Sequence, residues 1–233
     1  MLLCDNKKIM FNQKYHMTRE ENVLWARRMI VDSIWKGANL EGIPVTFPET
    51  QVIYDGLIPQ GYTVNQITTI NNLKHAWEFI LKNIDAPFDL EIIRGIHRKV
   101  GASEIVLDPG QLREQEVIVT GTEWTPAKPN LEDVCLQIER IAHIDNPTEQ
   151  ALDAFATICR GQWFNDGNKR AAQLTANFLL IRAGAGLFSI PVTEPAKQVA
   201  FITKLISYYE TGDSISLKQW LYNNALSGTG GVI

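Results

Sequence analysis

Helix-starting signals followed by helical hydrophobic spacing recur along almost the whole chain, and they constrain its fold more than any other feature. Thr18 and Glu21 form a capping-box pattern, after which apolar residues recur at helical spacing up to Gly37. Thr46 and Glu49 repeat the pattern before a short helix that stops at Gly56. Further helical patterns cover residues 63–82, 88–100, 131–142, 151–160, 169–183, 196–209 and 217–226. The sequence therefore predicts an all-α fold.

One segment departs from this pattern. Residues 107–129 are rich in glycine and proline, and within them Val117, Ile118 and Val119 stand beside Thr120 and Gly121. A short β-branched run next to a turn pair is typical of a small β-hairpin. We expect this to be the only extended segment.

Composition excludes several classes of protein. The 233 residues carry a net charge of −4, which gives no general reason to expect a nucleic-acid partner. Cys4, Cys135 and Cys159 are odd in number and have no CxxC spacing, so neither a disulfide framework nor a zinc site is predicted. No apolar run is long enough for a secretory signal or a membrane span, and we expect a cytoplasmic protein.

The segment most typical of a chemical function is FNDGNKR, residues 164–170, where an acidic, glycine-containing turn runs into a strong helical pattern. Gly167 and Asn168 then lie near a helix N-terminus, whose free N–H groups and dipole attract anions. Lys169 and Arg170 add positive charge, so phosphate is the natural ligand. Asp166 suits this site mainly if a divalent cation such as Mg²⁺ lies between its carboxylate and the phosphates. The alternative is an ordinary capped helix with a solvated basic face.

Two motifs in this chain resemble those of the Fic/Doc family. FNDGNKR is similar to the core of the family motif His-x-Phe-x-Asp/Glu-Gly-Asn-Gly/Lys-Arg, and DPGQLREQEVIVTG followed by PAKP resembles the family's flap segment. The resemblance covers roughly residues 88–190. We accordingly divide the chain into an N-terminal helical extension (1–62), a Fic-like core (63–190) and C-terminal helices packed on that core (191–233).

The resemblance implies an all-helical fold with a short β-hairpin flap, binding of ATP and Mg²⁺, and transfer of AMP to a protein hydroxyl. Members of the Doc-like branch transfer phosphate instead. By position, Asp166 would hold the metal, the turn 167–169 would form the anion hole, and Arg170 would contact or support the phosphates. Phe164 would anchor the loop. The flap residues 117–121 would bind an extended segment of the target protein by strand addition.

The sequence departs from the family at the position of the motif histidine, which Gln162 occupies, followed by Trp163. The histidine is the family's general base, and a glutamine amide cannot accept a proton near neutral pH. The other histidines are His16, His75, His97 and His143. A lone histidine on a helix is more often structural, so we expect none of them to replace the base.

A second departure concerns Gln173, where AMP-transferring members carry another arginine. Glu41 and Gly42 resemble the end of the family's inhibitory segment, although Gly37 stands where a hydroxyl residue is expected. The alternative is an ordinary helix exit. The family's inhibitory glutamate pairs with the arginine that Gln173 replaces. We therefore expect no salt bridge for Glu41, which is left to hydrogen-bond to Gln173 or to occupy the space of the terminal phosphate.

Two hypotheses of different classes follow. The first is an adenylyltransferase impaired by Gln162, with a Doc-like kinase as its variant. The second is a non-catalytic protein that binds nucleotide or a protein partner on the same fold. Both predict nucleotide and protein partners, no nucleic acid and no membrane, and both allow an oligomer.

Overall fold

The computed structural model describes residues 11–230, and within them the chain is helical, as expected. The helices are α1 (Arg19–Leu40), α2 (Phe47–Tyr54), α3 (Val64–Lys82), α4 (Leu90–Val100), α5 (Leu131–Ala142), α6 (Pro147–Gly161), α7 (Asn168–Arg182), α8 (Pro195–Thr211) and α9 (Ile215–Asn224). Two short strands, β1 (Leu187–Phe188) and β2 (Leu226–Ser227), pair antiparallel. Within residues 11–230, no helix is both long and apolar enough to span a membrane.

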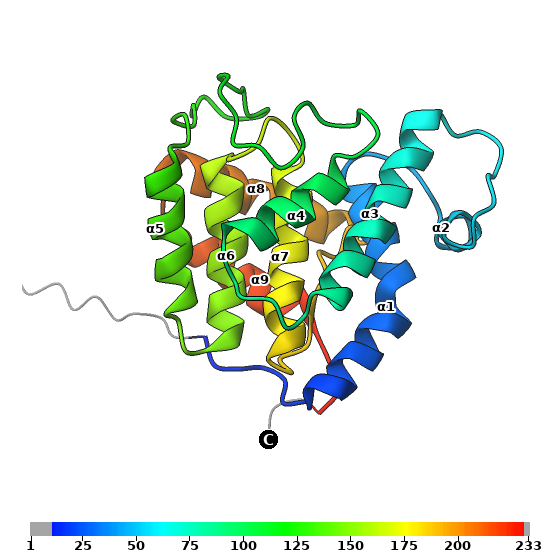
Figure 1. Ribbon diagram of the computed structural model, residues 1–233, viewed down its shortest axis with the longest axis horizontal. Coiled ribbons are helices and arrows are strands. Elements are labelled where there is room, and N and C mark those ends of the chain that lie inside the picture. The colour runs from blue at the N-terminus through cyan, green and yellow to red at the C-terminus, as the bar shows by residue number, and fades with distance from the viewer. Residues whose placement is uncertain (1–10, 231–233) are drawn as a thin grey trace, which may run out of the picture.

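Helix α7 lies at the centre of the bundle (Figure 1) and is buried on nearly all sides. It packs most extensively against α6 and also contacts α1, α3 and α4. Helix α7 contributes Phe178, Leu179 and Leu180 to the core, and it also buries polar residues such as Thr175 and Asn177. This burial fixes the position of the N-terminus of α7.

Local signals position the other helices. Both predicted capping boxes are present. The side chains of Thr18 and Thr46 each accept a hydrogen bond from the N3 backbone, and the carboxylates of Glu21 and Glu49 accept one from the backbone N–H of these threonines. Helix α1 does not stop at Gly37 but continues to Leu40. A Cβ at Gly37 would lie 3.5 Å from Leu73 of α3, which is an ordinary contact distance, so this glycine neither ends the helix nor is required by its packing.

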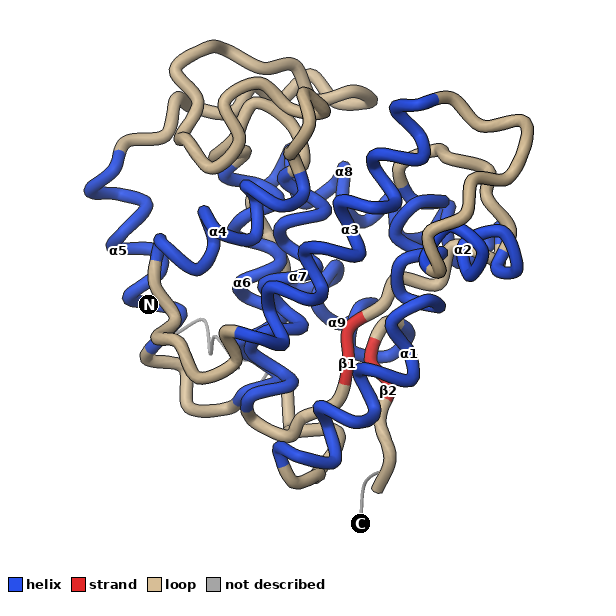
Figure 2. The backbone as a smooth tube through the Cα atoms, turned by 45° about the vertical axis from the view of Figure 1, so that its right-hand side comes forward, coloured by secondary structure: helices blue, strands red, loops and turns tan. Residues whose placement is uncertain are grey.

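The long loop between α4 and α5 crosses the top of the bundle in Figure 1 and contains the expected flap. Residues 117–121 have a turn at Thr120 and Gly121 but no strand pairing, so the flap is a loop and not the expected hairpin. The paired strands are instead β1 and β2, which lie beside α1 in Figure 2. These two-residue strands are too short to give a sequence signal.

Candidate functional site

The site is built around the start of α7. Its N-cap is Gly167, which has a φ of 77° and provides no side-chain cap. The backbone N–H groups of residues 168–170 donate no hydrogen bond within the described chain, because intrahelical bonding begins with Ala171 donating to the Gly167 carbonyl. A Cβ at position 167 would lie 3.2 Å from Val100 and 3.3 Å from His97, so both the backbone and the space require glycine. The result is an open helix end suited to anions.

Four charged side chains meet at this helix end. The Arg170 side chain is only 4 % exposed, and its Nη2 donates to Asp166 Oδ2 over 2.9 Å. Its Nε lies 3.1 Å from Glu41 Oε2, while Lys169 Nζ lies 3.5 Å from Glu41 Oε1. The carboxylates of Glu41 and Asp166 thus neutralise the two cations. No anion need be bound for the charges in this cluster to balance.

The expectation that no salt bridge is available to Glu41 is wrong. Glu41 caps the C-terminal end of α1 and reaches Lys169 and Arg170, the basic residues in the first turn of α7. Gln173 lies one turn further along α7 and lines a small cavity together with Gly37 and Trp77. Glu41 therefore pairs with the arginine that the motif retains, although the second arginine is absent.

Asp166 stands at the edge of an open pocket of about 280 Å³ and is 67 % exposed. Glu41 and Arg170 line the same pocket, together with residues of α3 and of the loop after α4 (Asn65, Gln66, Thr69, Glu104 and Ile105). Only one Asp166 oxygen is used by Arg170, so the other is available to a ligand. Among residues 11–230 no group of three His, Cys, Asp or Glu side chains could hold a metal ion. A cation here would need ligand oxygens in addition to Asp166.

Gln162 ends α6 in the left-handed region, with a φ of 43°. Its Nε2 donates to the Cys159 carbonyl over 2.7 Å, and its Oε1 accepts from Asn168 Nδ2 over 3.1 Å. Both ends of the amide are therefore used inside the turn. The position that normally carries a base instead stabilises the conformation of the loop.

Asn168 shapes the same loop with its side chain. Its Oδ1 accepts from the Phe164 N–H over 2.9 Å, and its Nδ2 donates to the Phe164 carbonyl over 2.8 Å. Only the backbone N–H of Asn168 is left for an anion. Phe164 is fully buried, in agreement with its expected role as an anchor.

His97 is a site residue that the sequence reasoning missed. Its ring stacks on Phe164 with centroids 3.8 Å apart, and its Nδ1 accepts from the Gly110 N–H over 2.8 Å. Nε2 must then carry the proton, which it donates to the Asp166 carbonyl over 2.7 Å. Burial, followed by the charge of Arg170, lowers the pKa of His97 to about 4. The neutral ring joins the flap loop to the motif loop. No local sequence pattern around residue 97 predicts this role.

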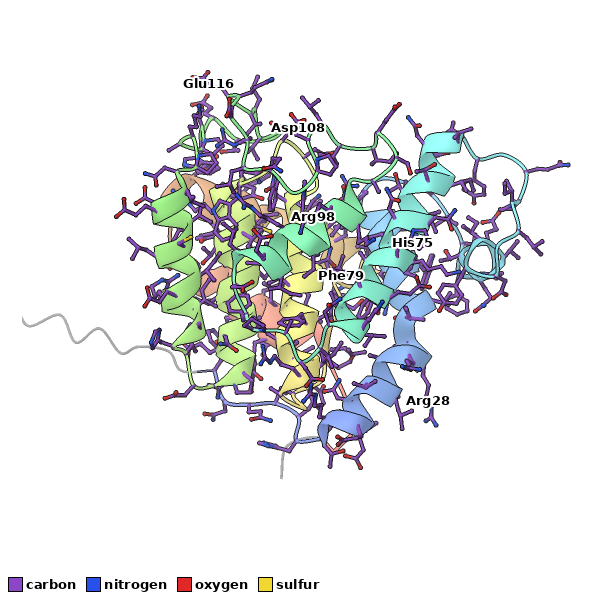
Figure 3. All side chains as sticks on the ribbon, in the orientation of Figure 1. Arg28, His75, Phe79, Arg98, Asp108 and Glu116 are labelled. Atoms are coloured by element: carbon purple, nitrogen blue, oxygen red, sulfur yellow. The ribbon has the colours of Figure 1, made fainter. Side chains whose placement is uncertain are left out.

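The remaining histidines do not approach the site. His75 is exposed on α3 (Figure 3), and His143 is exposed at the end of α5, where its ring contacts the Glu139 carbonyl. His16 lies before α1, and none of the three lines the pocket of Asp166 and Arg170. The expectation that no other histidine takes the place of the base stays a prediction.

Arg113 fixes the base of the flap. Its side chain, in a residue only 1 % exposed, donates to the carbonyls of Gln162, Gln115, Pro126 and Ala127. The two sides of the flap are thereby tied to the motif position. Further out, Ile118 is 96 % exposed and a Cβ at Gly121 would lie 3.3 Å from Ile206 of α8. The flap therefore packs against α8 at Gly121, whereas Ile118 is exposed to solvent.

Cysteine chemistry is not part of this site. Cys135 is exposed and Cys159 is buried, and both are free; Cys4 lies outside the described residues. Burial raises the pKa of the Cys159 thiol well above its usual value, so its thiolate is disfavoured.

Comparison with known proteins defines the class. Residues 87–180 match the model of the Fic/DOC family. The fold is similar to that of Fic-1 from Caenorhabditis elegans, with a TM-score of 0.70 and 19 % identity over 92 % of this chain and 64 % of that one. It is also similar to a Fic-domain signalling protein from Bacteroides thetaiotaomicron, with a TM-score of 0.68 and 18 % identity over 89 % of this chain and 85 % of that one. Residues 87–180 are thus similar to the Fic/DOC family, with Gln162 at the position of the motif histidine.

Among curated proteins, the chain is similar to protein adenylyltransferases. It is 25 % identical to protein adenylyltransferase fic-1 of C. elegans over 82 % of this chain and 39 % of that protein. It is also 25 % identical to protein adenylyltransferase Fic of Drosophila melanogaster over 72 % of this chain and 36 % of that one. The chain thus spans less than two fifths of the length of these relatives.

Proposed function

We propose that this chain is a Fic-type adenylyltransferase, transferring AMP from ATP to a hydroxyl group of a protein, with an activity lowered by Gln162. The observation that carries the proposal is the open N-terminus of α7, where free backbone N–H groups lie beside Lys169 and the buried Arg170. This arrangement is suited to polyphosphates. The names of the curated relatives support AMP as the transferred group.

The residues present fit a magnesium nucleotide. Arg170 Nε is buried without a hydrogen-bond partner, so the cluster has a donor that a phosphate oxygen can satisfy. Asp166 has a free oxygen at the pocket edge, and Mg²⁺ in nucleotide sites usually takes one or two carboxylates together with phosphate oxygens. The ion would neutralise phosphate charge there. The pocket of about 280 Å³ is slightly below the usual range of ~300–1,000 Å³ for ligand sites, so it suits the phosphate end of the nucleotide.

The expected chemical weakness lies at Gln162. AMP transfer forms a bond between the target hydroxyl and the α-phosphorus, releases pyrophosphate, and requires the hydroxyl proton to leave. Gln162 cannot take that proton, and a positioned base typically contributes a factor of about 10² to 10⁴ to the rate. In this chain the remaining groups bind and orient, and the proton passes to solvent.

Glu41 is proposed as an internal inhibitor. Its carboxylate occupies the two cations, Lys169 and Arg170, that the phosphates would use. A nucleotide must displace Glu41 or bind beside it, and two anions at one pair of cations repel each other. Removal of this carboxylate should therefore tighten nucleotide binding.

The flap residues 117–121 are proposed to bind the target. Their backbone is unpaired in this structure, so an extended segment of the target can add to it as a strand. The hydroxyl acceptor of that segment would then lie near Gln162, because Arg113 ties the flap base to the Gln162 carbonyl.

A second candidate function is nucleotide or protein binding without catalysis. It is favoured by Gln162, whose amide nitrogen and oxygen each make one hydrogen bond within the loop. A Doc-like phosphate transfer remains a variant of the first proposal, favoured by Gln173 in place of the second arginine.

Transfer of label from ATP tests these readings. ATP labelled on the α- or the γ-phosphate is incubated with the chain and a cell lysate, in parallel with Gln162→His and Glu41→Gln plus Gln162→His. We expect weak α-label transfer by the parent chain and stronger transfer by Gln162→His and by the double variant. Arg170→Ala in the Gln162→His background should abolish it. Transfer of γ-label alone would identify a kinase, and silence from all variants together with intact ATP binding would favour the binding protein.

A further inference from the structure

A second pocket, separate from that of Asp166 and Arg170, lies beside the segment that leads from the flap to α5. We call it the exit pocket. It has a volume of about 330 Å³ and is formed by residues 124–130 of the flap, the start of α5, the end of α6 and Tyr208 of α8. Helices α5 and α6 lie side by side below the flap loop in Figure 1. None of its lining residues lines the pocket of Asp166.

The exit pocket is positively charged, although the whole chain has a net charge of −4. Lys128, Arg140 and Arg160 line it, against one acidic residue, Asp133. Arg140 pairs with Asp153 over 2.9 Å, but Asp153 is shared with Lys218 at 2.7 Å, so this group keeps an excess positive charge. Within the described chain, Lys128 and Arg160 have no acidic partner. An anion entering the pocket therefore meets uncompensated positive charge.

Arg160 is held in a fixed orientation. Its Nε and Nη2 donate to the carbonyls of Tyr208 and Tyr209, each over 3.2 Å, and its guanidinium lies 4.9 Å from the centre of the Trp124 ring. Trp124 in turn stacks on Tyr209. Because neutral carbonyls hold this guanidinium, its full charge remains available, and its immobilisation reduces the entropy cost of binding a ligand.

The pocket adjoins the position where the acceptor hydroxyl would lie. Gly161 and Trp163, on either side of Gln162, line it. Arg113 donates to the Gln162 carbonyl and also to the carbonyls of Pro126 and Ala127. It therefore holds Gln162 next to the flap segment that lines the pocket. A segment lying along the flap thus extends directly into the exit pocket.

The lining indicates a carboxylate side chain in preference to a phosphate. Apolar surfaces of Trp124 and Pro129 adjoin the cations and suit a methylene stem that carries a charged end. The N-terminus of α5 is already capped by Asn130 and carries Glu132 and Asp133 in its first turn, which disfavours a ligand with two negative charges.

We propose that the exit pocket binds an acidic side chain of the segment that is modified, so that an aspartate or glutamate near the acceptor hydroxyl specifies the substrate. Binding of a carboxylate depends only on the exit pocket, whereas the role of this binding in substrate selection rests on the proposed function. The exposed acids Glu114, Glu116 and Glu123 elsewhere on the flap, of which Figure 3 labels Glu116, repel acidic residues at other places. The preference is therefore for an acid at one position and not for an acidic segment as a whole.

Titration with a short peptide tests the proposal without ATP. The probe is Ac-Gly-Glu-Gly-Ser-Gly-Glu-Gly-NH2, its control has both Glu replaced by Gln, and the signals are the indole N–H resonances of Trp124 and Trp163, assigned with Trp→Phe variants. We expect saturable shifts of both resonances with the Glu peptide and much weaker binding of the Gln peptide. Arg160→Gln should weaken binding at least about tenfold, since hydrogen bonds to charged groups have that weight. The exposed Lys128→Gln should weaken it about threefold. Arg28→Gln on α1 is the matched control and should change nothing.

Several results would overturn the proposal. They are no saturable shift at millimolar peptide, equal binding of the Gln peptide, or binding that is insensitive to both Lys128→Gln and Arg160→Gln in variants with native circular dichroism. Tighter binding of inorganic phosphate than of the peptide would show a general anion site and reject the carboxylate assignment. Because no transfer is measured, failure here is distinct from failure of the proposed adenylyltransferase activity.

Discussion

Replacement of Arg113 by lysine should loosen the flap from the motif. Arg113 donates to four carbonyls, at 2.6 Å to Gln162, 2.7 Å to Gln115, and 3.2 and 2.6 Å to Pro126 and Ala127. Lysine keeps the charge, but its single ammonium cannot reproduce this fork and reaches about two of the carbonyls. At about 1.5 to 3 kcal/mol for each hydrogen bond to a charged group, the two lost bonds give an upper limit of about 6 kcal/mol. We expect about 3 kcal/mol, because water can reach the outer carbonyls.

For a chain of this size, 1 kcal/mol lowers Tm by about 2 to 4 °C, so Arg113→Lys should lower it by about 6 to 12 °C. Urea unfolding gives the free energy, and hydrogen exchange over residues 111–130 locates the change. Arg182→Lys is the control, since Arg182 donates a single bond to the Ala86 carbonyl that lysine can keep. A loss below about 1 kcal/mol in Arg113→Lys, with unchanged exchange in the flap, would refute the reasoning.

Three further predictions concern the motif loop and the cysteines. His97 has a folded pKa of about 4 against an ordinary 6.5, so its contribution to stability is complete above about pH 6.5 and is lost as the pH falls towards 4. Urea unfolding of the metal-free chain should show about 2 kcal/mol of this loss between about pH 7 and pH 5, and an unchanged pH dependence in His97→Gln would contradict it. Asn168→Ala removes three buried hydrogen bonds and should cost about 3 kcal/mol on urea unfolding, with a parent-like value counting against its role in the loop. Iodoacetamide should alkylate the exposed Cys135 and leave Cys159 unmodified, as peptide mass spectrometry can establish; equal modification would show that Cys159 is accessible.

The family motif alone does not describe the charge balance of the site, because two carboxylates neutralise the basic residues of the motif. The motif supplies Lys169 and Arg170, but in the folded chain their charges are already matched by Glu41 and Asp166. Under the proposed function, a nucleotide would therefore displace Glu41 or bind beside it. Glu41 has a salt-bridge partner although Gln173 stands where a second arginine is expected, because Glu41 reaches Arg170.

The sequence alone determined the local features of this protein. The capping boxes at Thr18 and Thr46, the helical spacing and the turn before α7 are set by residues within a few positions of one another, and all are present in the structure. The motif also placed Gly167 at a helix start. These features follow from backbone hydrogen bonding and steric limits, which neighbouring residues decide.

Only the tertiary structure decided which distant side chains meet. Glu41 reaches Lys169 and Arg170 because α1 packs against α7, and His97 reaches Asp166 because α4 does. Arg113 joins the two sides of the flap base by bonding the carbonyls of Gln115, Pro126 and Ala127. Such contacts depend on how buried helices pack, and residues that lie 69 or more positions apart produce no local sequence pattern from which their contact could be predicted.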